Sequence, residues 1–337
     1  MAVPSLLEKF QTAASKREPL KQVTDAYRIF NGVGDGLVGV TLDRFGDRYQ
    51  LQFFSEQSLG NYEQIINVAC ELFDPEFLVA KFRTDPAGRA LEHPRMDVVV
   101  GTPEQAVGVV REGNAKFHVD LLDTVNPGLF LDMRDVRLEV EERFTQMSQD
   151  GGPSKTRDGI ANDGLRFLNL FSYTCSFSVH ARLGGAAIAT NADISGKILD
   201  KGRENYALNN LDLRPGEFFK GNAIEYVDWA TKKGLRFDGI VLDPPSFARF
   251  KGTNFNVREH LMPLAVKCAG LLNPEGFLMV SSNYSGFVLE QFSKDVLAAT
   301  RNVFPKAHTA WSRSQGADFP GAGLSKESSL VATLVEV

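Results

Sequence analysis

The segment "VLDPPSFARF", residues 241–250, places a carboxylate, Asp243, at the end of an apolar run and follows it with Pro244 and Pro245. Neither proline can continue a ladder of strand hydrogen bonds, and their fixed φ angles make the exit from the strand stiff. A carboxylate and the carbonyl groups of a rigid corner can accept hydrogen bonds from an amino group. Because Asp-Pro-Pro also ends strands and begins turns, the chemical interpretation needs support from other segments.

A second polar turn follows the apolar run at residues 165–171. That run ends at Phe171, and Ser172, Tyr173 and Thr174 come next, where a dinucleotide-binding turn would carry GxGxxG. Glycine is needed in that motif because the backbone must approach a pyrophosphate at a helix N-terminus. The turn therefore disfavours a nicotinamide or flavin dinucleotide, and it leaves room for a nucleoside without phosphates.

Two further apolar runs end in Asp193 and Asn222. Asp193 follows Phe171 at about the twenty-residue spacing at which an acid accepts hydrogen bonds from ribose hydroxyls. It could equally cap the helix expected from Ser195. The Asn222 amide could reach an adenine edge, although asparagine at such a position is also a common turn residue.

Alternating strand and helix patterns position these residues. The expected strands are residues 165–171, 186–193, 216–222, 237–243 and 276–283, and the expected helices are 176–184, 195–210, 223–233, 256–272 and 286–300. Short, nearly continuous apolar runs are typical of parallel strands buried on both faces. With a final antiparallel hairpin in the last 31 residues, about 307–337, we predict a doubly wound, mostly parallel, seven-stranded Rossmann-like α/β sheet.

The first half of the chain predicts a different fold. Alternating apolar residues and Gly-Asp turns in residues 24–58 indicate antiparallel hairpins, and "NYEQIINVACELF" has helical spacing. We predict four segments: an N-terminal extension (1–23), a small α+β domain (24–147), a linker or loop (148–164) and the Rossmann-like domain (165–337).

Composition excludes several classes of protein. Three dispersed cysteines and five histidines without HExxH spacing give no disulfide framework and no metal site. No stretch looks like a signal peptide or a membrane span, so we expect a cytoplasmic protein. The net charge of -5 argues against a general nucleic-acid coat and leaves room for a local basic patch.

The order of the four strand ends resembles the class I S-adenosylmethionine-dependent methyltransferases. More narrowly, "NPGLFLDMRDVR", "LNLFSYTCSFSVHARLGGA", "VLDPPSFAR" and "GADFP" are similar to motifs of the bacterial 23S ribosomal RNA large-subunit methyltransferases, which modify cytosine C5 or guanine N7. The resemblance implies S-adenosylmethionine as cofactor and ribosomal RNA as substrate. It implies a cofactor site that contains Phe171, Ser172, Tyr173, Thr174, Asp193 and Asn222.

The resemblance also assigns Phe130, Asp132 and Arg134 of "GLFLDMR" to the cofactor pocket, with the arginine as a fork for the methionine carboxylate. Without it, Asp132 would be taken as a helix cap and Arg134 as part of a solvated face. The chain departs from the family at Pro127-Gly128, Met133 and Cys175-Ser176, where the family shows Thr-Gly, Gln and glycines.

The atom that receives the methyl group follows from the nucleophiles near the strand ends. Cytosine C5 is activated by a cysteine thiolate, but this chain has Ser246 after the fourth strand and "SSNYSG" where cytosine-C5 members carry Ser-Cys. A base nitrogen of RNA is therefore predicted as the acceptor, with Asp243, Pro244 and Pro245 as the catalytic corner.

Ser246, Phe247 and Tyr284 are the predicted substrate-binding residues, because an aromatic ring can stack on a base. Alternatives are a methyltransferase for a protein or small molecule, and a protein that binds the cofactor without activity. A homodimer is left open by the sequence.

Overall fold

The computed structural model spans residues 1–337 and describes residues 4–85, 89–150, 164–250, 253–321 and 330–337. Contacts divide the chain into two units. Unit 1 is Met1–Arg134 with Gln315–Ser328, and unit 2 is Asp135–Ser314 with Ser329–Val337. Within the described residues, no helix is long and apolar enough to cross a membrane.

This division differs from the predicted boundaries. The predicted N-terminal extension belongs to unit 1, because α1 (Leu6–Arg17) packs on β1 (Ala26–Asn31) and on α3 (Tyr62–Phe73). The helix after "GLFLDM", α4 (Arg134–Gln149), runs into the predicted linker, and all of it after Arg134 belongs to unit 2. Its apolar residues Val136, Val140 and Phe144 recur every fourth position and are buried. Residues 151–163 of the predicted linker lie outside the described residues.

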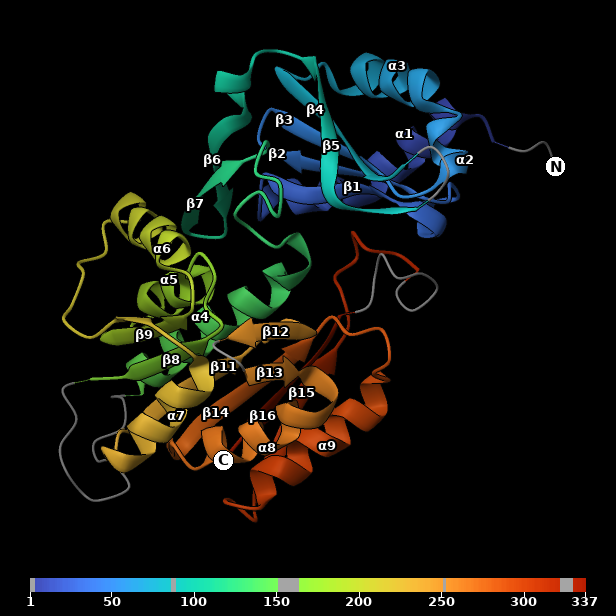
Figure 1. The fold of residues 1–337 in the computed structure, drawn as a ribbon. Coiled ribbons are helices and arrows are strands. Elements are labelled where there is room, and N and C mark those ends of the chain that lie inside the picture. Colours follow the sequence, from blue (N-terminus) through green and yellow to red (C-terminus); the bar gives the residue numbers. More distant parts are fainter. Residues whose placement is uncertain (1–3, 86–88, 151–163, 251–252, 322–329) are drawn as a thin grey trace. The chain divides into compact units, whose positions relative to one another are not determined.

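Unit 1 is built on a five-stranded sheet in the order β1-β2-β3-β4-β5 (Figure 1). The other strands of this sheet are β2 (Val40–Phe45), β3 (Arg48–Phe53), β4 (Phe77–Thr84) and β5 (Ala90–Val100), and a short helix, α2 (Glu56–Leu59), follows β3. The first two hairpins are antiparallel, as the Gly-Asp turns predict, whereas β3 and β4 are parallel because α2 and α3 return the chain. One face of the sheet is apolar and packs against α1, where Phe10 stacks on Phe30 of β1 at 4.3 Å between ring centroids.

The opposite face of this sheet is polar yet buried. Arg28 on β1 makes two bonds to Asp43 on β2, from Nε at 2.7 Å and from Nη2 at 3.1 Å. Lys81 on β4 is fully buried, and its Nζ donates to the Asp123 carbonyl at 2.8 Å. Burial, together with the neighbouring Arg83, lowers the pKa of Lys81 to about 8.

Shorter elements complete unit 1. They are η1 (Glu18–Gln22), η2 (Gly32–Asp35), η3 (Pro103–Ala106), the β6 (Val107–Glu112) and β7 (Ala115–Asp120) hairpin, and η4 (Leu131–Met133). The segment Gln315–Gly321 also belongs to unit 1, although the strands on either side of it belong to unit 2. The chain thus leaves unit 2 after β15, enters unit 1 and returns before β16.

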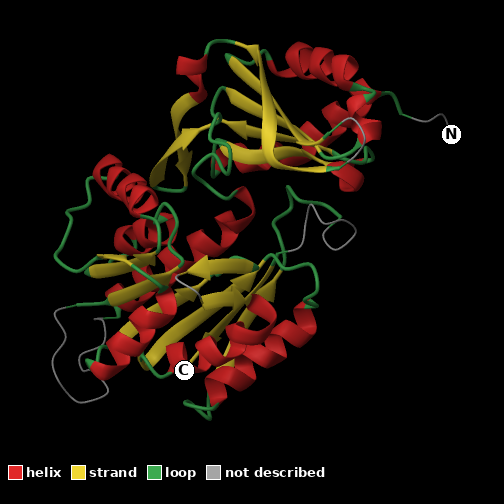
Figure 2. Ribbon diagram, in the orientation of Figure 1, coloured by secondary structure: helices red, strands yellow, loops and turns green. Residues whose placement is uncertain are grey.

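Unit 2 contains the predicted doubly wound sheet, which is confirmed. In the described part of the chain its seven strands, drawn in yellow in Figure 2, have the order β10-β9-β8-β11-β14-β16-β15. They are β8 (Arg166–Leu170), β9 (Ile188–Asp193), β10 (Phe218–Lys220), β11 (Phe237–Leu242), β14 (Leu272–Ser282), β15 (His308–Arg313) and β16 (Val331–Glu336). The first five strands are parallel, and β16 runs antiparallel to both β14 and β15.

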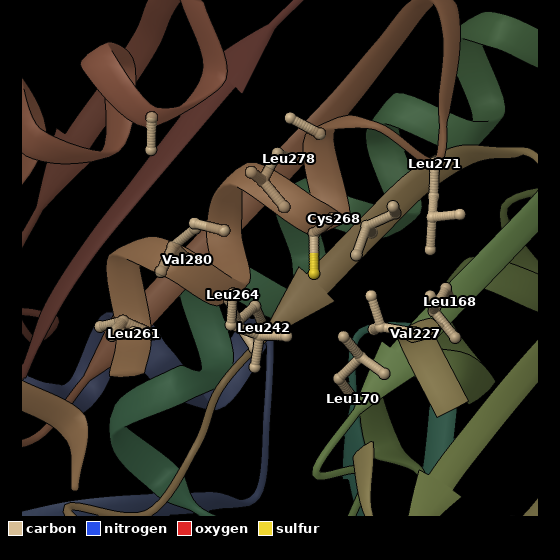
Figure 3. Close-up of a cluster of buried hydrophobic side chains, with 14 of the residues drawn as sticks. Leu168, Leu170, Val227, Leu242, Leu261, Leu264, Cys268, Leu271, Leu278 and Val280 are labelled. Carbon is tan, nitrogen blue, oxygen red and sulfur yellow. The ribbon is translucent and has the colours of Figure 1, made fainter. Parts of the chain in front are cut away.

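Helices cover both faces of this sheet. α7 (Ala223–Lys232), α8 (Val257–Ala269) and α9 (Leu289–Arg301) pack on one face, where Cys268 lies among buried leucine and valine side chains (Figure 3). α4, α5 (Ser176–Leu183) and α6 (Gly196–Leu208) cover the other face (Figure 1). The sequence analysis did not predict the β12 (Phe247–Phe250) and β13 (Thr253–Asn256) hairpin between the Asp-Pro-Pro corner and α8.

We expect the depressed pKa of Lys81 to make stability depend on pH. Between about pH 8 and pH 10.5 the unfolded chain keeps a proton on this lysine that the folded chain has released, so stability rises with pH. In urea unfolding, the free energy of unfolding of the wild type should increase over this range by up to about 3 kcal/mol relative to Lys81→Met. A difference between the two proteins that stays constant with pH would contradict the assignment.

Candidate functional site

Four parallel strands bring all the predicted site residues of unit 2 except Tyr284 to one edge of the sheet. Leu170 of β8 pairs with Ala192 of β9 on one side and with Leu242 of β11 on the other. Lys220, the last residue of β10, pairs with Asp193. The turns that follow these strands therefore begin at the same carboxyl edge, which is where open α/β sheets bind ligands.

The turn after β8 has an unusual backbone. Phe171, Tyr173 and Cys175 have φ angles of 60°, 47° and 63°, in the left-handed region that glycine prefers. Non-glycine residues in strained conformations of this kind cost on the order of 1–3 kcal/mol each, and they cluster at functional sites. Hydrogen bonds hold the turn: the Ser172 carbonyl accepts from the Cys175 N–H at 2.8 Å.

Two buried residues of α6, Asn205 and Gly202, contact this turn. The Asn205 side-chain amide donates to the Thr174 carbonyl at 3.0 Å. Gly202 faces Cys175, and a Cβ at position 202 would overlap the Cys175 sulfur. Sequence analysis did not identify Asn205 or Gly202, since nothing in the sequence indicates which helix residues contact a distant turn.

Asp193 joins the first two turns. Its Oδ2 accepts from the Tyr173 N–H at 3.1 Å, and its Oδ1 accepts from the Ser195 N–H at 2.9 Å. Burial raises the pKa of the Asp193 carboxyl, and the bonds from nearby backbone N–H groups partly offset this shift. A carboxylate has about four acceptor positions, so each oxygen keeps capacity for a hydroxyl donor. Asp193 therefore organises the turns and can still accept from a ribose.

Asn222 begins α7. Its Oδ1 accepts from the Ile224 N–H at 2.9 Å, which makes it an N-cap. The amide nitrogen, Nδ2, makes no hydrogen bond to another described residue, and so it is available as a donor. The turn and the ligand-binding interpretations of Asn222 are compatible, because they use different atoms.

The Asp-Pro-Pro corner follows β11. The hydroxyl of Ser281 on β14, a fully buried residue, donates to Asp243 Oδ1 at 2.6 Å. Pro244 is buried and Pro245 is exposed. Ser246 donates through Oγ to Asn283 Oδ1 at 3.4 Å, so the loops after β11 and β14 are connected. The carboxylate of Asp243 is thus held in one orientation.

Aromatic residues lie in the segments that follow β8, β11 and β14. Phe247, the first residue of β12, is 52% exposed. Phe255 on β13 packs against Phe171 at 5.5 Å between ring centroids, which connects the hairpin to the turn after β8. Tyr284, after β14, is partly buried and packs edge-on against Phe287. The β12–β13 hairpin therefore carries an exposed ring next to the rigid corner.

Phe130, Asp132 and Arg134 lie in unit 1. Arg134 is buried, and both of its terminal nitrogens bond to Asp318: Nη2 to Oδ1 at 2.8 Å and Nη1 to Oδ2 at 3.0 Å. The guanidinium is therefore not on a solvated face, and the two nitrogens that would bind a methionine carboxylate are bonded to Asp318. Phe130 is 39% exposed, whereas its neighbours Leu129 and Leu131 are buried.

The chain matches the family described as S-adenosylmethionine-dependent methyltransferase over residues 75–298. YwbD of Bacillus subtilis (strain 168), named provisionally as a ribosomal RNA large subunit methyltransferase, is 33% identical over 300 residues, 88% of this chain and 71% of that protein. Ribosomal RNA large subunit methyltransferase I of Klebsiella pneumoniae (strain 342) is 32% identical over 298 residues, 88% of this chain and 70% of that protein.

Among solved structures, SMU.776 complexed with SAH superposes with a TM-score of 0.81 at 24% identity, covering 100% of this chain and 83% of that one. This likeness concerns the fold alone. The residues of unit 2 nevertheless fit S-adenosylmethionine. Asp193 offers acceptors for two hydroxyls, Asn222 offers a donor for a ring nitrogen, and no phosphate-binding glycine turn is needed.

Asp193 yields a prediction about affinity. Asp193→Asn should weaken binding of S-adenosylhomocysteine by at least tenfold in calorimetry, because an amide accepts from only one of two ribose hydroxyls. Asp200→Asn, on an exposed part of α6, is the matched control and should bind like the wild type. Equal affinities of Asp193→Asn and the control would leave Asp193 as a helix and turn cap only.

Proposed function

Because the chain belongs to the S-adenosylmethionine-dependent methyltransferase family, we propose that it methylates a base nitrogen of ribosomal RNA. S-adenosylmethionine is its cofactor. The single observation that supports the nitrogen acceptor is the Asp243 carboxylate, held by Ser281 in a rigid Asp-Pro-Pro corner beside the exposed Phe247 ring.

Ribosomal RNA as substrate is supported by the names of the relatives. Both relatives cover 88% of this chain at 32–33% identity, and both are named as ribosomal RNA large subunit methyltransferases. A ribosomal substrate agrees with a cytoplasmic location, which we also propose. The base would be presented in a single-stranded or flipped-out form, since a base inside a helix is out of reach of such a site.

The cysteines argue against a carbon acceptor. Methylation of cytosine C5 requires a thiolate that adds to the ring, and burial raises the pKa of both Cys175 and Cys268, which keeps them as thiols. Cys175 is part of the turn after β8, and its sulfur packs against Gly202. Cys268, on α8, lies in the apolar core of unit 2 (Figure 3). Asn283 and Tyr284 occupy the loop where cytosine-C5 members carry Ser-Cys.

The residues of this chain would act mainly by positioning the base against the methyl group of the cofactor. When bound, S-adenosylmethionine supplies an electrophilic methyl group on its sulfonium. Asp243, oriented by Ser281, accepts a hydrogen bond from the amino group of the base and directs the nitrogen lone pair. Aligned reactants of this kind can lower a barrier by roughly 7–11 kcal/mol. The Phe247 ring stacks on the base, which contributes about 1–3 kcal/mol.

Methyl transfer from labelled S-adenosylmethionine tests the substrate. We expect incorporation into ribosomal RNA or a ribosomal subunit, and nuclease digestion with mass spectrometry should place the label on a base nitrogen. Labelled 5-methylcytosine would overturn the nitrogen acceptor while keeping the RNA substrate. Label that enters only protein or a small molecule would overturn the RNA substrate.

Asp243 and Phe247 should affect different kinetic parameters. Asp243→Asn should reduce kcat by roughly 100-fold without changing affinity for S-adenosylhomocysteine, because it removes a charged acceptor at the reacting base. Phe247→Leu should raise KM for RNA about tenfold through lost stacking. Asp228→Asn, at an exposed ion pair with Lys267, serves as the control for both. Unchanged turnover in Asp243→Asn would remove Asp243 from the mechanism.

A further inference from the structure

The β12–β13 hairpin, which follows the Asp-Pro-Pro corner, has two different faces. In its antiparallel register Phe247 pairs with Asn256, the residue after Phe255. Because side chains alternate along a strand and paired residues share a face, Phe247 and Phe255 belong to opposite faces of the hairpin. Phe247 is exposed, whereas Phe255 is only 5% exposed and belongs to the apolar core of unit 2. The hairpin therefore presents one aromatic ring outward and packs another inward.

The inward ring contacts the turn after β8. The ring centroids of Phe255 and Phe171 lie 5.5 Å apart, and the ring planes meet at 49°. Phe171 is the first residue of the turn, and two residues later the Tyr173 N–H donates to Asp193. A single aromatic contact thus joins the hairpin to the turn that Asp193 shapes.

Backbone bonds and α8 hold the base of the hairpin together. The Val257 N–H donates to the Ser246 carbonyl at 3.2 Å, which ties the two ends of the hairpin to each other. The Asn256 N–H donates to Nδ1 of His260 at 2.9 Å, and the His260 ring packs against Phe255 at 5.6 Å between centroids. A displacement of Phe255 would therefore move β13 and its partner strand, not one side chain alone.

The backbone of Phe171 makes this contact sensitive to what fills the turn. Its φ of 60° lies in the left-handed region, which a residue with a Cβ keeps only where its surroundings hold it there. A cofactor bound at the turn adds contacts that hold this conformation and so restricts the ring that Phe255 packs on. Two ligands that order the same element favour each other's binding, even when they do not touch.

We propose that Phe255 is a positioning residue that couples the two parts of the site. S-adenosylmethionine bound at the turn after β8 holds the hairpin, through the Phe171–Phe255 contact, in the position where Phe247 receives the base. This inference rests on the proposed binding of the cofactor at this turn and of RNA at Phe247. Cofactor and RNA then raise each other's affinity by the same factor, because coupling between two binding sites is reciprocal.

Hydrogen–deuterium exchange on the full chain tests the coupling without RNA. In the wild type, saturating S-adenosylhomocysteine should slow exchange of the β12 and β13 amides by roughly fivefold or more. Phe255→Leu keeps an apolar side chain but removes the ring contact, so it should bind S-adenosylhomocysteine in calorimetry and lose this protection. Phe237→Leu alters an equally buried phenylalanine at the start of β11, away from the turn, and should keep the protection.

A second measurement uses a ribosomal RNA fragment as the probe. S-adenosylhomocysteine should lower the Kd for this RNA by roughly fivefold or more in the wild type and in Phe237→Leu, and by about twofold or less in Phe255→Leu. In the kinetics, Phe255→Leu should raise KM for RNA more than it lowers kcat. A defect that was only structural would reduce stability and leave the ratio of the two RNA affinities unchanged.

Hairpin amides that exchange equally fast with and without bound S-adenosylhomocysteine in the wild type overturn the coupling, and so does equal loss of protection in Phe237→Leu. If Phe255→Leu does not fold, Phe255→Met takes its place, and protection that persists there overturns the role of Phe255. A wild type that binds no S-adenosylhomocysteine overturns the cofactor site as well. Failure to bind RNA contradicts the proposed substrate, and the exchange result then decides the coupling alone.

Discussion

The arrangement of the unit 2 site depends on the left-handed turn between β8 and α5. Three of its residues, Phe171, Tyr173 and Cys175, adopt a backbone conformation that costs free energy in any residue with a Cβ. Asp193 accepts from the Tyr173 N–H, and Asn205 donates to the Thr174 carbonyl, so neighbouring elements compensate for the strain. The acid that would hold a ribose is thus also the residue that shapes the turn beside it.

Much of the fold could be predicted from the sequence, because parallel strands buried on both faces must be short apolar runs. The predicted strand 237–243 is β11 (Phe237–Leu242), and the predicted helix 176–184 is α5 (Ser176–Leu183). The β12–β13 hairpin was missed because "FARFKGTNFN" has neither a clear alternation nor a two-residue turn motif. Contacts between distant segments, such as Ser281 with Asp243, leave no local pattern, since each partner looks like an ordinary strand residue.

Arg134 shows why residue type and motif do not determine a role. An arginine after Asp-Met in this motif looks like a fork for a ligand carboxylate, and geometrically it is a fork, but the carboxylate belongs to Asp318. Burial decides the outcome: a guanidinium inside the protein must be paired, and a permanent partner satisfies it whether or not a ligand is bound. The motif thus predicted that this arginine binds a carboxylate, but not that the carboxylate is the Asp318 side chain.

Cys175, in the left-handed turn after β8, is packed against a glycine of α6, Gly202. The motif that the sequence resembles has glycines in this turn, where they would relieve the left-handed strain, whereas this chain has a cysteine there. The Cys175 sulfur occupies the space that a side chain at 202 would need. A glycine at 175 would lower the backbone strain but leave a cavity beneath the turn, and dense packing makes such a cavity costly. The side chain of Cys175 therefore has two opposite effects: it adds backbone strain to the turn, and it fills the space between the turn and α6.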